Sequence, residues 1–218
     1  MIDDLSTLVA PAYVAVPDSG TGPGVVVLHA WWGLNDFFTR LCNRLAQAGF
    51  VAVAPDLYDG KIASTVEEAE RLLGESDVDL IRRRIDEAIT FLRRHPAVQG
   101  TGIGLIGFSM GGAWALLTST THPDDVAAVV IFYGNEAADY SNSRAAYLGH
   151  FAEDDPWEPS DGVQQLQAAL QAAGRDVTFY TYSGVGHWFF EDNRPEYDAK
   201  AARLAWERSI EFLRIQLA

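Results

Sequence analysis

Short apolar runs alternate with amphipathic segments along the chain. Several of the runs are continuous stretches of Val, Ile, Leu and Ala without polar alternation, which is typical of strands covered on both faces. They predict strands over residues 13–16, 25–29, 51–54, 102–107, 127–132, 146–150 and 177–182.

The segments between these runs carry the 3.6-residue period of amphipathic helices. Ile81, Ile85, Ile89 and Leu92 form one apolar stripe, and similar stripes lie within 36–48, 163–170 and 206–217. The basic run at 82–84 is expected on the solvated face of its helix. Strand–helix alternation predicts an α/β domain over 1–218, with a mostly parallel sheet of seven or eight strands flanked by helices on both faces. The connection 134–144 is too short for a helical lid.

Composition narrows the classes of partner. Of 218 residues, 48% are hydrophobic, and 30 acidic residues against 16 basic ones give a formal charge of -14. So negative a surface disfavours binding to nucleic acid or anionic membranes. Met1–Asp4 lack the basic start of a secretory signal, so a soluble, cytoplasmic protein is expected. Cys42, the single cysteine, is expected in the core. The sequence leaves monomer and homodimer equally open.

One motif indicates a nucleophile. Gly107-Phe108-Ser109-Met110-Gly111 matches G-x-S-x-G, and it stands between an apolar run at 103–106 and a helical opening at 112–117. This strand–turn–helix context is that of a nucleophile elbow, in which the serine takes a strained conformation and side chains at the two glycines would clash. The alternatives are a glycine-rich helix start packed on a strand and an anion-binding helix terminus. The pattern favours Ser109 as a nucleophile.

A serine nucleophile on this fold needs a histidine base that follows it, with an acid between them. His187 lies on a Gly-containing loop between the last predicted strand and the last helix. The other histidines fail on order or position: His29 and His95 precede the serine, His122 ends the helix beside it, and His150 leaves too little chain after it.

The acid should follow the strand 146–150. That loop offers four carboxylates, Glu153, Asp154, Asp155 and Glu158. The acid holds the imidazole tautomer and stabilises the imidazolium, so only one carboxylate needs to point inward. On position alone, Asp154 and Asp155 are barely separable.

The chain resembles the dienelactone hydrolase family from its first strand to its last helix. The pieces that carry the resemblance are Pro55-Asp56-Leu57-Tyr58, Gly107–Gly112, Tyr133-Gly134, Asp155 with Pro159, and Gly186-His187-x-Phe189. The resemblance implies an α/β-hydrolase fold, and its Asp-x-x-x-Pro register favours Asp155 as the acid. It also implies an oxyanion hole made by the backbone N–H groups of Trp31 and Met110.

Three positions depart from the family pattern. Ser109 stands where the family proper has a cysteine, Ala30 where it has a glutamate, and Glu191 where it has an arginine that holds the substrate carboxylate. A glutamate that manages the ionisation of a thiol has little use beside a serine, so the first two changes agree with each other. Together the departures weaken the expectation of the family's lactone-specific activity and leave the hydrolytic machinery in place.

Aromatic side chains gather in the loops expected around this chemistry. Together with Trp31, they are expected to line an acyl or alcohol pocket, and they are Trp32, Tyr58, Tyr133, Trp157 and Trp188. The sequence therefore predicts a hydrolase of small carboxylic esters or lactones that works through an acyl-serine without cofactor or metal. The alternatives are an acyltransferase or peptidase on the same triad, and a catalytically inactive ligand sensor. The natural substrate and pathway are not named by the sequence.

Overall fold

This computed structural model describes residues 11–218. Within this range the chain forms seven strands and six helices, joined by loops. The expectation about Met1–Asp4 concerns residues outside this range. The strands are β1 (Ala12–Ala15), β2 (Gly22–Leu28), β3 (Val51–Pro55), β4 (Val98–Phe108), β5 (Val126–Phe132), β6 (Ala146–Asp154) and β7 (Val177–Gly186). The helices are α1 (Asp36–Gln47), α2 (Val66–Gly74), α3 (Val78–Arg94), α4 (Met110–Thr121), α5 (Ser160–Ala172) and α6 (Ala199–Gln216).

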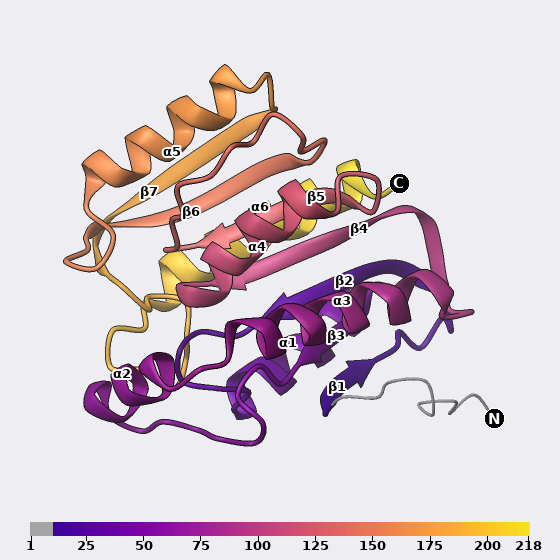
Figure 1. Ribbon diagram of the computed structural model, residues 1–218, viewed down its shortest axis with the longest axis horizontal. Coiled ribbons are helices and arrows are strands. Elements are labelled where there is room, and N and C mark those ends of the chain that lie inside the picture. The colour runs from indigo at the N-terminus through magenta and orange to yellow at the C-terminus, as the bar shows by residue number, and fades with distance from the viewer. Residues whose placement is uncertain (1–10) are drawn as a thin grey trace.

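The strands form one sheet in the order β1-β3-β2-β4-β5-β6-β7 (Figure 1). Only β1 is antiparallel to its neighbour, and every other pair is parallel. The predicted α/β class and mostly parallel sheet are therefore confirmed. Residues 133–145, between β5 and β6, contain no helix, as the short connection predicted.

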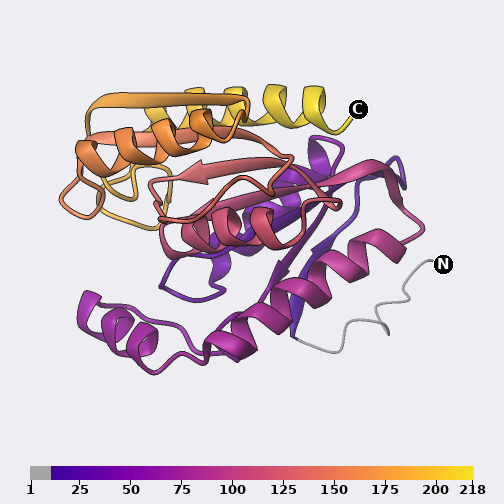
Figure 2. The same cartoon turned by 45° about the horizontal axis from the view of Figure 1, so that its top comes forward.

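Helices cover both faces of the sheet, which Figure 2 shows from a second angle. The alternation of side chains along β4 separates the two layers. Gly104 faces Leu213 of α6 and Leu217 just after it, and Phe108 on the same face contacts Phe38 of α1. Gly107 points the other way, toward the start of α4. The end of β4 is thus fixed between α1 on one side and α4 on the other.

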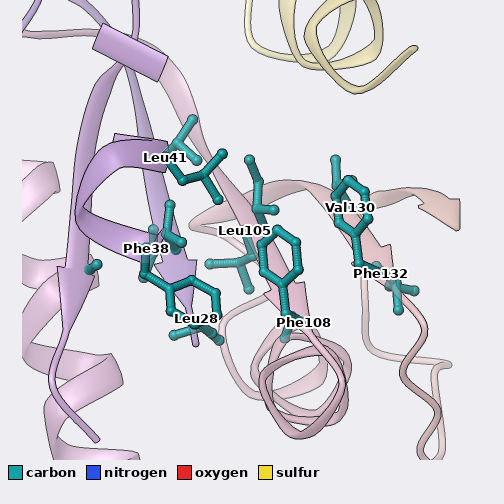
Figure 3. Close-up of a cluster of buried hydrophobic side chains, with 14 of the residues drawn as sticks. Leu28, Phe38, Leu41, Leu105, Phe108, Val130 and Phe132 are labelled. Carbon is teal, nitrogen blue, oxygen red and sulfur yellow. The ribbon is translucent and has the colours of Figure 1, made fainter. Parts of the chain in front are cut away.

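Aromatic rings fill the core next to the carboxyl end of the sheet (Figure 3). Phe38 meets Phe108 with ring centroids 5.4 Å apart, and Phe108 stacks on Phe132 at 4.6 Å. All three side chains are buried, as is Cys42, in agreement with the sequence-based expectation. Large apolar side chains of this kind each contribute about 1.5–3 kcal/mol on burial, which holds the strand ends rigid.

The structure differs from the sequence-based picture in two places. Helix α2 was not predicted, although Thr65 and Glu68 form a capping box that marks its start. The basic run 82–84 is not wholly a solvated face, because Arg84 is buried and pairs with Asp59 at 2.7 Å. Its Nε and Nη1 atoms have no partner. Among residues 11–218, no helix is both long and apolar enough to cross a bilayer.

The Arg84–Asp59 pair generates a stability prediction. Asp59→Asn should lower the free energy of unfolding by about 1 kcal/mol or more, because it removes the charge opposite a buried guanidinium in which two nitrogen atoms already have no partner. Asn also tolerates the positive φ of 58° at this position, so the backbone is not newly strained. The matched control is Asp79→Asn in the exposed Arg82–Asp79 pair, for which a loss below about 0.5 kcal/mol is expected. Urea unfolding would check both, and equal effects would contradict the assignment.

Candidate active site

Ser109 occupies a sharp turn between β4 and α4. Its φ of 49° and ψ of -115° lie outside the regions that non-glycine residues ordinarily adopt. The Ser109 N–H donates to the Phe132 carbonyl at 2.9 Å, which ties the turn to neighbouring β5. Strain of this kind persists only where the surroundings enforce it, and it concentrates at functional sites.

The glycines around Ser109 are required by close backbone contacts. A Cβ atom on Gly107 would overlap the carbonyl oxygen of Gly111, and one on Gly111 would overlap the Leu28 carbonyl oxygen. A Cβ atom on Gly134, after β5, would lie 2.6 Å from the Ser109 carbonyl oxygen. The G-x-S-x-G spacing therefore follows from the way α4 begins against the ends of β2 and β5.

The structure brings Ser109, His187 and Asp155 into one hydrogen-bonded chain. His187 Nε2 lies 3.0 Å from Ser109 Oγ, and His187 Nδ1 lies 2.7 Å from Asp155 Oδ2. The side chains of His187 and Asp155 are only 3% and 1% exposed. Because a carboxylate can only accept, Nδ1 donates, and Nε2 of the neutral ring is free to accept the serine hydroxyl proton.

Sheet register explains why Asp155 rather than Asp154 meets the histidine. Asp154 at the end of β6 is paired with Gly186 at the end of β7. The next residues along the chain, Asp155 and His187, therefore leave the sheet side by side. The Asp155 Oδ1 atom accepts hydrogen bonds from the backbone N–H groups of Trp157 and Glu158, at 2.9 and 3.0 Å. Both oxygens of the Asp155 carboxylate are thus engaged and its orientation is fixed, whereas Asp154 is exposed.

A buried pair lies behind His187. The Tyr133 ring packs on the His187 ring with centroids 4.7 Å apart, and the Tyr133 hydroxyl donates to Glu191 Oε1 at 3.0 Å. Burial raises the pKa of the Glu191 carboxyl to about 8, against the opposing effects of the Tyr133 hydrogen bond and the nearby Arg194 charge. Glu191 is therefore mostly protonated at neutral pH, and it presents no full negative charge to a substrate.

Four tryptophans pack together beside the serine and histidine. Trp31 contacts Trp32, Trp157 and Trp188, with ring centroids 5.4, 5.1 and 6.1 Å apart. Trp157 is 44% exposed, whereas the other three are buried. Trp188 has a positive φ of 62°, so the cluster holds the residue after His187 in an unusual backbone conformation.

Of the five aromatic residues expected to contact substrate, Trp157 is exposed, and the other four, Trp188 among them, are buried. Trp32 and Tyr133 are 1% and 0% exposed, so in this structure they support the site from behind rather than line a cavity. Tyr58 is also buried, and its hydroxyl donates to the sulfur of Met110 at 3.0 Å, next to Ser109. Trp157 is the one whose ring is broadly open to solvent.

Arg194 and Glu158 are two ionisable residues near the site to which the sequence assigned no role in the structure. The Arg194 guanidinium lies 3.6 Å from the Trp32 ring centroid, and its Nε atom is buried without a partner. Burial, followed by the charge of Asp155, raises the pKa of Glu158 to about 7. No motif marks either residue. The environment of Arg194 comes from Trp32, which is distant in sequence, and that of Glu158 comes from burial within its own loop.

Comparison with known proteins adds the family context. The sequence model of the Dienelactone hydrolase family matches residues 10–217. "Protein usf" of Aquifex pyrophilus is 33% identical over 216 residues, covering 93% of this chain and 91% of that protein. A "Putative carboxymethylenebutenolidase" of Aquifex aeolicus is 32% identical over 215 residues, covering 94% and 93%. The crystal structure of a putative dienelactone hydrolase from Klebsiella pneumoniae superposes with a TM-score of 0.83 at 26% identity, covering 94% of this chain and 92% of that one.

The buried Glu191 carboxyl predicts a pH dependence of stability. Its folded pKa of about 8 exceeds the ordinary 4.5, so the folded protein holds this proton more tightly than the unfolded chain does. The stabilising effect of this tightly held proton should therefore be lost progressively as the pH rises above 4.5, and it should be gone above about pH 8. Glu191→Gln, which stays neutral, should unfold at higher urea than the unmodified protein at pH 9, with a smaller difference at pH 5. A constant difference across this range would contradict the assignment.

Proposed function

The chain belongs to the dienelactone hydrolase family and is a lactone or ester hydrolase with the α/β-hydrolase fold, and from that premise we propose that it cleaves small carboxylic esters or lactones through an acyl-serine intermediate. The observation that carries this proposal is the continuous contact from Ser109 Oγ through His187 to Asp155. Three side chains hydrogen-bonded in this order activate a serine hydroxyl at neutral pH without a metal or cofactor.

The proposed reaction begins with acylation of Ser109. The hydroxyl proton passes to His187 Nε2 as Oγ bonds to the carbonyl carbon, and the π electron pair moves onto the carbonyl oxygen. When the C=O bond forms again, the bond to the leaving oxygen breaks, and the leaving alkoxide takes the proton from Nε2. The alcohol is then free, or, for a lactone, stays attached to the acyl group.

Water completes the cycle by the same steps. It gives one proton to His187 Nε2 while its oxygen bonds to the acyl carbon, and collapse releases the acid and returns the proton to Ser109 Oγ. Throughout, Asp155 keeps Nδ1 as the donor and stabilises the imidazolium. Its fixed Oδ1, held by two backbone N–H groups, keeps that orientation without further reorganisation.

Two backbone N–H groups form the proposed oxyanion hole. Among the turn and loop hydrogen bonds of residues 11–218, neither the Trp31 nor the Met110 N–H is a donor to another backbone group. The start of α4 lies against the end of β2, since a Cβ atom on Gly111 would stand 2.6 Å from the His29 carbonyl oxygen. Preorganised donors of this kind stabilise the charge that builds on the carbonyl oxygen.

The proposed substrate contacts come from the aromatic cluster. Trp31, Trp157 and Trp188 stand next to the triad, and Trp157 offers the exposed surface that an acyl or alcohol group would meet first. Tyr58 borders the site through Met110. Trp32 and Tyr133 would take part only by holding these residues in place.

Two other functions on the same fold are separable by experiment. An acyltransferase or peptidase would pass the acyl group to an alcohol or cleave an amide, so product analysis with added alcohols and with anilide substrates distinguishes them. An inactive ligand sensor would leave Ser109 unreactive toward a fluorophosphonate label. The short contact between Ser109 and His187 favours an active enzyme.

Substitution of the triad tests the proposed mechanism. Ser109→Ala and His187→Ala should each lower kcat by at least roughly 10³ without loss of folding, because the two residues act as a unit. Asp155→Asn should lower kcat less than either, and Asp154→Asn, the matched control on the neighbouring exposed residue, should have little effect. Steady-state hydrolysis of a short aryl ester, with circular dichroism for folding, measures these effects. A greater loss from Asp154→Asn than from Asp155→Asn would overturn the assignment of the acid.

Substrate charge gives a second test. A carboxylate-bearing dienelactone must lose its hydration, and the position of the family's arginine holds a buried, neutral carboxyl, Glu191. The acidic protein also repels an anion on approach. We expect kcat/KM for a neutral short-chain aryl ester to exceed that for the dienelactone carboxylate by at least about tenfold. If the carboxylate is instead faster and Arg194→Met abolishes that advantage, Arg194 supplies the missing cation.

A further inference from the structure

His29 is a completely buried histidine that the proposed mechanism does not use. It follows the last residue of β2 and lies immediately before the loop Ala30–Gly33. Its ring contacts Tyr58 and Phe38, with centroids 5.3 and 6.0 Å apart. Its place before Ser109 in the chain excludes it as the base but says nothing about other roles.

Two backbone hydrogen bonds define the state of this imidazole. His29 Nδ1 lies 2.7 Å from the Ala30 carbonyl oxygen, and His29 Nε2 lies 3.1 Å from the Leu57 backbone nitrogen. A carbonyl can only accept and a backbone N–H can only donate, so Nδ1 carries the proton and Nε2 accepts. Both bonds are satisfied only by the neutral ring with its proton on Nδ1.

The surroundings keep the ring neutral. Burial lowers the pKa of His29 to about 4, although the Ala30 carbonyl and the charge of Asp56 act in the opposite direction. Asp56 is itself held by the N–H groups of Tyr58 and Gly60. At neutral pH the ring therefore stays a donor at one nitrogen and an acceptor at the other.

The bond to Ala30 acts on the peptide group that contains the Trp31 N–H. A peptide unit is planar and trans, so its C=O and N–H point in opposite directions. Whatever holds the Ala30 oxygen therefore also sets the direction of the Trp31 N–H. The same oxygen accepts a second bond from the Gly33 N–H at 3.2 Å. Hydrogen bonds to a carbonyl also polarise its amide, which makes the N–H a stronger donor.

We propose that His29 is a positioning residue, whose Nδ1–H orients and polarises the Ala30–Trp31 peptide so that the Trp31 N–H is fixed as an oxyanion donor. This inference rests on the proposed function, because it assigns a role in stabilising the acylation transition state. It also explains a buried polar group in a core that would otherwise favour an apolar side chain at the end of a strand.

Two substitutions separate the nitrogen atoms of the ring. The Asn side-chain amide can occupy the place of Nδ1 and keep a donor to the Ala30 oxygen. The Gln amide reaches the place of Nε2 instead, where its oxygen accepts from the Leu57 N–H, and the hydrogen bond to the Ala30 oxygen is lost. We expect His29→Gln to lower kcat at least tenfold, with KM within about twofold, which corresponds to about 1.4 kcal/mol of transition-state stabilisation. His29→Asn should recover most of that loss. His95→Gln, at a remote histidine that also bonds backbone, is the control and should leave turnover unchanged.

A transition-state analogue adds a readout that a merely structural role would not move. A trifluoromethyl ketone forms a tetrahedral oxyanion on Ser109, so His29→Gln should weaken its inhibition by the same factor by which kcat/KM falls. Binding of the neutral alcohol product, which offers no oxyanion to these donors, should change little. Equal losses for Gln and Asn, or a loss confined to KM, would overturn the proposal.

A measurement on the unmodified protein guards against variants that fail to fold. Nitrogen-15 NMR of the labelled histidines should show His29 with its proton on Nδ1, and a proton on Nε2 would overturn the proposal. Fluorophosphonate labelling of Ser109 and ester turnover by the unmodified protein test the proposed function separately. If those succeed while His29→Gln is fully active, only the role of His29 is refuted.

Discussion

The close approach of the start of α4 to the end of β2 is the constraint on which the rest of the site depends. A side chain at Gly111 would collide with the Leu28 and His29 carbonyl groups, so only glycine fits at this position in the first turn of α4. Parallel pairing of β2 with β4 in register, Leu28 opposite Gly107, delivers the two loops to the same edge. Contacts with β2 and β5 hold Ser109 in its strained conformation. The free energy gained by burial of the core behind the turn offsets the cost of this backbone strain.

The other half of the site depends on the pairing of β6 with β7. Because parallel strands end at one edge, the residues after Asp154 and Gly186 emerge side by side, and Asp155 and His187 meet without a long loop on either side. This arrangement explains how an acid and a histidine 32 residues apart in sequence come to be hydrogen-bonded. It also places Trp157 and Trp188, which follow them, against the loop from β2.

The features that could be predicted from sequence are those with a local cause. The buried strands appear as apolar runs, and the elbow is marked by glycines at fixed spacing. The missed features depend on partners that periodicity does not reveal. Arg84 lies on a helix whose face looked solvated, yet it pairs with Asp59, 25 residues earlier. Trp32 and Tyr133 were expected to line a pocket, but neighbouring loops bury them. Strand β6 was expected to end at His150 and continues to Asp154, because pairing outlasts the apolar run.

The tryptophan cluster has an optical consequence. Four of the six tryptophans of the chain are in mutual contact beside Ser109 and His187. Indoles at such separations couple their electronic transitions, so this cluster is expected to contribute strongly to the near-ultraviolet circular dichroism and the intrinsic fluorescence. Trp157, the most exposed of the four, changes its surroundings whenever a group settles on it. On the proposed function, a ligand that binds beside Trp157 is expected to change its emission, so binding could be followed without a label.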